Sequence, residues 1–88
     1  MSVADGLMAI FAELGAIRHQ AADSAEAQAL VAKLQQYITD HYYTCTLQIL
    51  KGLGYLYIAG DEMTENIDKA GGEGTAEFAH KAIEIFTR

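Results

Sequence analysis

The chain has 88 residues, of which 51% are hydrophobic and 20% are charged. That length suits one domain, residues 1–88, because two domains would each be too small to bury a core. Twelve acidic and six basic side chains leave a net charge of −6, which disfavours direct contact with nucleic acid or anionic lipid.

The cysteine count and the apolar runs indicate a cytoplasmic protein. One cysteine cannot form an internal disulfide, which fits a reducing compartment. The longest nearly apolar run, Gly52–Gly60, has nine residues and is too short to span a bilayer. No charged and then apolar leader opens the chain, so we expect no signal peptide and no membrane contact.

The first half of the chain carries two apolar stripes with helical spacing. The first predicts a helix over about Asp5–Ile17, and its members are Leu7, Ile10, Phe11, Leu14 and Ile17. Asp23 and Glu26 then offer a capping box for a second helix. The second stripe consists of Ala27, Leu30, Val31, Leu34 and Ile38.

The third segment, about Thr44–Ala59, has little polar face, with Gln48 and Lys51 as its clearly polar positions. A helix that is apolar nearly all round is typical of a buried central helix. An alternative is a strand over Leu53–Ala59, where tyrosines alternate with leucines. No second strand of comparable quality is available to pair with it.

The last third of the chain predicts two more helices. Gly60 should end the third helix, and Asp61 can cap a short helix that runs to about Lys69. A flexible glycine-rich loop over Gly71–Gly74 follows, and Thr75 should cap the last helix. The expected inner face of that helix is Phe78, Ala79, Ala82, Ile83 and Phe86. The sequence therefore predicts an all-α fold of five helices, four long and one short.

Seven of the twelve acids lie from Asp61 onward. This acidic surface is either a solvated face or a docking patch.

His41 and Cys45 are four residues apart and would share a face of a continuous helix. Such a pair can form an activated thiolate or supply two metal ligands. No orienting third group is evident, and a closed zinc site needs four ligands, whereas His19 and His80 are distant in sequence. No phosphate-binding motif is present either. We therefore expect no catalytic residue, no metal and no cofactor.

Two glycines within the third helix, Gly52 and Gly54, need a physical reason, because each costs about 0.5–1 kcal/mol relative to alanine. Either another helix crosses closely at these positions, or the missing side chains leave a concavity. Tyrosines nearby favour a concave binding wall, since their rings provide rigid contact area and a hydroxyl. They are Tyr42, Tyr43, Tyr55 and Tyr57.

Several segments together resemble the TipAS antibiotic-recognition domain. They are "HYYTC", "LGYLYI", "DEMTENID" and "GEGTAEFAHKAI", with "ADS" at Ala22–Ser24 at a matching distance upstream. This domain is the C-terminal effector module of bacterial MerR-type transcription activators that thiostrepton induces. The resemblance covers residues 6–88, nearly the whole chain.

The resemblance implies a globin-like bundle with a groove between helices that accepts large, apolar and chemically varied antibiotics. In the family, the domain follows a DNA-binding winged helix-turn-helix and a long dimerisation helix, and ligand binding orders a segment preceding the bundle. We therefore expect either an excised effector domain or a free short form of it. DNA contact would come only from the absent N-terminal part, the parent regulator would be a homodimer and the isolated domain a monomer.

The resemblance also assigns residues. The positions that match the family fingerprint, and so should maintain the fold, are Leu53, Gly54, Tyr57, Asp61, Asn66, Ile67 and Asp68. A cysteine that captures thiopeptides covalently in the family falls at Gly52, which implies non-covalent binding in this chain. Together with the glycine and tyrosine pattern, this predicts the ligand-binding residues Tyr42, Tyr43, Cys45, Ile49, Gly52, Leu53 and Leu56.

Overall fold

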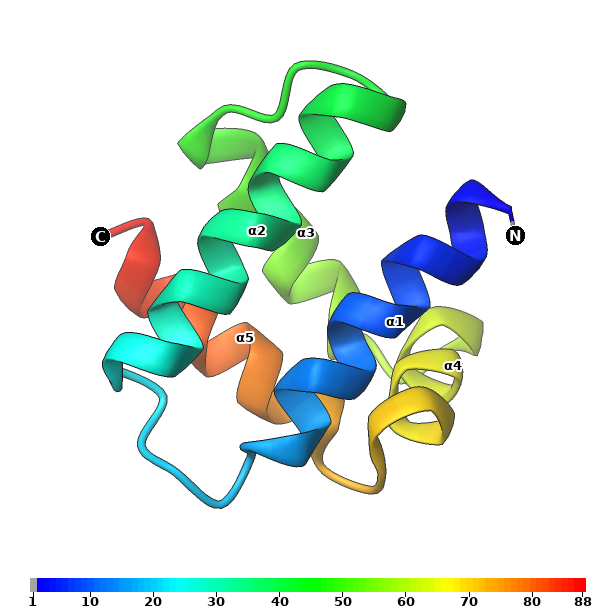
Figure 1. The fold of residues 1–88 in the computed structure, drawn as a ribbon, viewed down its shortest axis with the longest axis vertical. Helices are drawn as coiled ribbons and strands as arrows, with labels where there is room; N and C mark the ends of the chain where they lie inside the picture. Colours follow the sequence, from blue (N-terminus) through cyan, green and yellow to red (C-terminus); the bar gives the residue numbers. More distant parts are fainter. Residues whose placement is uncertain (1) are drawn as a thin grey trace.

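A computed structural model describes residues 2–88 and contains five helices (Figure 1). They are α1 (Val3–Ala16), α2 (Ala25–His41), α3 (Leu47–Tyr57), α4 (Glu62–Gly71) and α5 (Thr75–Phe86). The all-α prediction is confirmed. The alternative strand over Leu53–Ala59 is wrong, because residues 53–57 of this stretch are helical and form the second half of α3. Between residues 2 and 88 no helix is both long and apolar enough to cross a membrane.

Helix α5 is the central helix, and it packs against all four others. Its buried residues include three alanines, Ala76, Ala79 and Ala82. Small side chains let neighbouring helices approach closely, so one helix can be covered on several sides. Figure 1 shows α5 running behind α1 and α2, with the two chain ends on opposite sides of the molecule.

The expectation that the third helix is the buried central one is wrong. Only Leu50, Gly54 and Tyr57 of α3 are buried. The large apolar side chains exposed on α3 and at its C-terminal end are Leu47, Ile49, Tyr55, Leu56 and Ile58. Helix α3 packs mainly on α5 and α4, which cover one side of it and leave the remaining sides uncovered.

The α1–α4 contact is a close backbone crossing. A Cβ atom on Gly15 would lie only 2.6 Å from the carbonyl carbon of Gly71. Arg18, just after α1, donates hydrogen bonds from Nη1 to the carbonyls of Gly15 and Gly71 and from Nε to the carbonyl of Glu73, the last at 3.0 Å. The positive charge of Arg18 also lies at the C-terminal ends of α1 and α4, where the helix dipole is negative. Arg18 thereby fixes the glycine-rich loop to α1.

Three helix ends differ from the sequence expectation. Helix α2 is capped by Ser24, one residue after the predicted Asp23, and its hydroxyl accepts from the Ala27 N–H at 3.1 Å. The predicted capping box does not form, because Ala27 has no polar side chain to bond back to the cap. Helix α3 ends at Tyr57, before Gly60. Helix α4 extends to Gly71, two residues beyond the expected end. It is 10 residues long, nearly as long as α3 with 11 residues.

The N-terminus of α5 is capped from another helix. Gly74, with a φ of 91°, precedes the helix, and Thr75 is its first residue and not its cap. The Asp68 carboxylate of α4 accepts a hydrogen bond from the Ala76 N–H at 2.9 Å. Asp68 thus joins α4 to α5, and a carboxylate at a helix N-terminus is favourable for the helix dipole.

Candidate functional site

An apolar hollow of about 280 Å³ lies where α1, α2, α3 and α4 meet the α2–α3 loop. It is lined by Leu7, Ile38, Tyr42, Tyr43, Leu53, Leu56, Tyr57 and Met63. None of these side chains carries a charge at neutral pH. The volume is just below the range typical of ligand pockets, which begins at about 300 Å³. The hollow therefore suits one compact apolar group, and a larger molecule would extend onto the neighbouring surface.

The α2–α3 loop contributes two rings to the hollow. Helix α2 ends at His41, and the N–H groups of Tyr42 and Tyr43 both donate to the Ile38 carbonyl, at 2.8 and 3.2 Å. Each ring is 48% exposed, so each can change its contacts at little cost. These two tyrosines form the solvent-facing part of the wall.

The backbone of the same loop is fixed by α2. The Gln35 side-chain amide donates to the Cys45 carbonyl at 2.8 Å, and the Thr39 hydroxyl accepts from the Cys45 N–H at 3.1 Å. Both backbone polar groups of Cys45 are therefore satisfied although the residue is buried. This anchoring holds the tyrosines beside α3.

Tyr57 forms the base of the hollow. It is only 2% exposed, and its ring packs edge to face on Phe11 with centroids 5.1 Å apart and an interplanar angle of 83°. Burial raises the pKa of the Tyr57 phenol well above its ordinary value, and the nearby Tyr43 and Cys45 add to this effect. The phenol therefore stays protonated at neutral pH.

The structure brings four of the seven predicted ligand-binding residues together. Tyr42, Tyr43, Leu53 and Leu56 line the apolar hollow. The predicted ligand-binding residues did not include Leu7, Ile38 and Met63, which come from three other helices. They also omitted Tyr57, which the sequence analysis named as part of a tyrosine wall and as a residue that maintains the fold. Apolar residues on a helical stripe give no local signal of which ones border a hollow.

The other three predicted residues are not among those that line the hollow. Cys45 is buried at 3% exposure and Ile49 is 41% exposed on the surface of α3. A Cβ on Gly52 would meet nothing within 4 Å, so this glycine faces open space and not a packed groove.

Gly54 fits the close-packing explanation that was the alternative to a concavity. A Cβ there would lie 3.1 Å from Cγ2 of Ile83 and 3.3 Å from Nδ1 of His80, both on α5. The two glycines of α3 thus have different surroundings. Neither of them is among the residues that line the hollow.

The His41 and Cys45 pair does not share a helical face, because α2 ends at His41. The His41 ring packs against Tyr37 at a tilt of 41°, with centroids 4.3 Å apart, and the Cys45 thiol is buried. Burial also raises the pKa of that thiol, which lowers its thiolate fraction at neutral pH.

We expect Cys45 in the folded protein to react slowly with iodoacetamide at pH 7, and faster as the pH rises toward the raised pKa. Denatured protein is the control and should react at the rate of an ordinary cysteine. Mass spectrometry of timed samples measures both rates. Fast labelling of the native protein at pH 7 would contradict the buried, protonated thiol.

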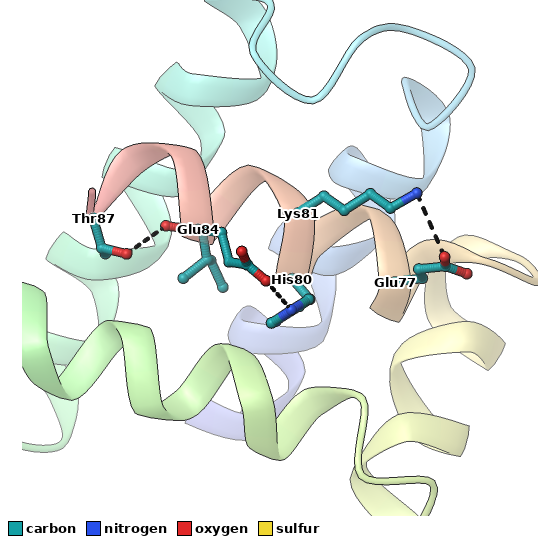
Figure 2. Close-up of polar contacts among 6 residues, drawn as sticks. Glu77, His80, Lys81, Glu84 and Thr87 are labelled. Carbon is teal, nitrogen blue, oxygen red and sulfur yellow. Dashed lines mark hydrogen bonds and ion pairs between the residues drawn. The ribbon is translucent and has the colours of Figure 1, made fainter.

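A second, larger hollow of about 610 Å³ lies beside α5, and most of its lining residues are ionisable. Its ionisable lining residues are Asp68, Glu73, Glu77, His80, Lys81 and Glu84. Figure 2 shows that the His80 Nε2 atom meets the Glu84 carboxylate and that the Lys81 ammonium lies 3.5 Å from the Glu77 carboxylate. Within residues 2–88, no three His, Cys, Asp or Glu side chains are grouped so that they could hold a metal ion. Four of these six side chains therefore form two pairs with one another.

The fold and the apolar hollow describe a small helical domain suited to binding an uncharged molecule. The chain belongs to the TipAS antibiotic-recognition domain family, whose model matches residues 2–86. It is also similar to the HTH-type transcriptional activator mta of Bacillus subtilis (strain 168), with 38% identity over 77 residues. The matched part covers 88% of this chain but only 30% of that relative. No solved structure matches the chain significantly.

Proposed function

We propose that this domain is the ligand-sensing part of a MerR-type transcriptional activator and binds apolar small molecules, including antibiotics, non-covalently in the apolar hollow. Membership of the antibiotic-recognition family and similarity to a transcriptional activator support the regulatory role. One observation supports the ligand site: uncharged side chains from four helices and one loop surround a single hollow.

Non-covalent binding is favoured by the position of the only thiol. Cys45 is buried and is not among the residues that line the hollow, and the residue at the family's covalent position is Gly52. The domain has no group there that could form a bond to a dehydroamino acid. Affinity would come from burial of apolar area, at about 25 cal/mol per Å². A binding role of this kind needs no enzymatic step.

The ligand would connect segments that are far apart in the sequence. Tyr42 and Tyr43 reach the hollow from the α2–α3 loop, and Met63 reaches it from α4. A bound molecule would hold these segments together, which gives the parent regulator a structural difference between its free and bound states. With a net charge of −6, the domain would leave DNA contact to a separate winged helix-turn-helix in a cytoplasmic, dimeric parent.

Thermal unfolding with a set of apolar antibiotics tests the proposal. A ligand at about a hundred times its Kd stabilises by about 2.7 kcal/mol, which should raise Tm by about 10 °C or more in a domain of this size. If no apolar compound raises Tm or shifts the NMR signals of the hollow, the proposal fails.

We expect Leu53→Trp to weaken binding of such a ligand roughly tenfold or more, because the indole would fill the hollow and remove apolar area from the contact. Gln48→Trp is the matched control, since Gln48 is an exposed residue of α3 that does not line the hollow. Calorimetric titration of both variants measures the effect. Equal affinities for the two variants would place the ligand elsewhere.

A helical protein-interaction module is the second candidate function. The exposed apolar side chains on α3 support it, because contiguous apolar surface often marks an interaction site. This function predicts that no small apolar compound raises Tm, whereas charged substitutions at Leu47 and Ile49 abolish partner binding. The thermal unfolding experiment therefore distinguishes the two functions.

A further inference from the structure

Three tyrosines line the hollow, and Tyr57 is the one of them that is buried. Among residues 2–88, no protein group forms a hydrogen bond with its hydroxyl, whereas the Tyr37 hydroxyl donates to the Val3 carbonyl. Within residues 2–88, Nδ1 of His80 is the fully buried side-chain nitrogen or oxygen atom that has no hydrogen-bond partner. The unpartnered Tyr57 hydroxyl does not belong to this class, so part of its surface is accessible. The Tyr57 hydroxyl is therefore not sealed within the core. Because Tyr57 lines the apolar hollow, we place the accessible side of its hydroxyl there.

We infer that ligands of this domain carry a neutral hydrogen-bond acceptor, such as a ketone or amide carbonyl, which receives the proton of the Tyr57 hydroxyl. This inference rests on the proposed function and adds the chemical class of the ligand. An apolar ligand without an acceptor would displace water from the hydroxyl and leave it without any partner, which is unfavourable in a buried site. A carbonyl in the same place restores the hydrogen bond.

The surroundings decide which kind of acceptor fits. Burial keeps the Tyr57 phenol protonated, so it is available as a donor at neutral pH. No cationic side chain lines the hollow, and the domain as a whole has a net charge of −6. A carboxylate would lose its hydration there without gaining a counter-charge. The acceptor should therefore be uncharged.

The two other tyrosines of the hollow differ from Tyr57 in exposure. Tyr42 and Tyr43 are each 48% exposed, whereas Tyr57 is 2% exposed. A hydroxyl in contact with bulk water exchanges one partner for another on binding and gains little. Discrimination between ligands should therefore depend mainly on Tyr57.

A pair of matched probes tests this inference. One is an aminonaphthalene ketone whose emission shifts to the red when its carbonyl accepts a hydrogen bond, and the other carries a methylene in place of the carbonyl. Both are titrated into the intact domain and into Tyr57→Phe. The variant keeps the ring that packs on Phe11 and loses only the hydroxyl. Tyr55→Phe is the control, because Tyr55 is 54% exposed and packs on His80, and it does not line the hollow.

We expect Tyr57→Phe to weaken binding of the ketone about five- to tenfold, the effect of one hydrogen bond, and to shift its bound emission to the blue. The methylene probe should bind Tyr57→Phe more tightly than the native domain, because the variant has no hydroxyl to leave without a partner. Tyr55→Phe should change neither affinity.

Three results would overturn the inference. If the ketone binds the native domain and Tyr57→Phe equally, the hydroxyl makes no contact with the ligand, while the proposed function stands. If Tyr57→Phe no longer folds, as judged by circular dichroism, the hydroxyl has a structural role instead. If neither probe binds the native domain, the hollow is not a ligand site and the proposed function fails as well.

Discussion

Gly15→Ala should lower the free energy of unfolding by about 3 kcal/mol, the upper range for one methyl group forced into a packed interior. The added Cβ would lie 2.6 Å from the Gly71 carbonyl carbon, and backbone atoms cannot move aside as a flexible side chain can. To relieve the contact, α1 and α4 would have to separate. Urea unfolding followed by circular dichroism measures the loss.

Gly52→Ala is the matched control, because it makes the same chemical change inside another helix. Nothing lies within 4 Å of a Cβ at Gly52, so no contact opposes the substitution. The higher helix propensity of alanine should stabilise the domain by about 0.5–1 kcal/mol. The two glycine substitutions should therefore have opposite signs. If Gly15→Ala leaves stability unchanged, α1 and α4 do not cross as closely as described.

Phe11→Ala should cost about 3–5 kcal/mol, because it removes a large ring from a position with no exposed surface. A domain of 88 residues has a total stability of about 5–10 kcal/mol, so the variant should be close to unfolding at room temperature. The lost ring also supports Tyr57, whose edge-to-face contact with Phe11 fixes the base of the hollow. Ligand affinity should therefore fall together with stability.

Phe86→Ala removes the same atoms at the end of α5, where the side chain is only partly buried. Its cost should be less than half that of Phe11→Ala, since less apolar surface is lost and the site can collapse or fill with water. Parallel urea titrations of the two variants give the comparison. Equal losses would mean that the Phe11 ring is not the core residue that its burial indicates.

Much of the local structure was predictable from the sequence. Apolar residues at three- and four-residue steps indicated α1, α2 and α5, since this spacing places them on one helical face. Errors of one to three residues arose at the helix ends, where the cap depends on geometry as well as residue type. Ser24 caps α2 in place of Asp23, and Asp68 reaches the α5 terminus from a different helix.

Four predicted site residues were found at the hollow, namely Tyr42, Tyr43, Leu53 and Leu56, because they are close in the sequence and lie on one loop and one helix. Their role in ligand binding stays a prediction. The remaining lining residues come from α1, α2 and α4, and no local pattern distinguishes them from ordinary core positions.

The sequence by itself determined that this chain forms five helices, because helix periodicity and capping are short-range properties. Only the tertiary structure decided which helix is central, as α5 is and α3 is not, and which apolar side chains surround a hollow. The physical reason is that burial depends on which surfaces meet. The alanines of α5 permit close approach from several sides, whereas the larger side chains of α3 are covered on one side only.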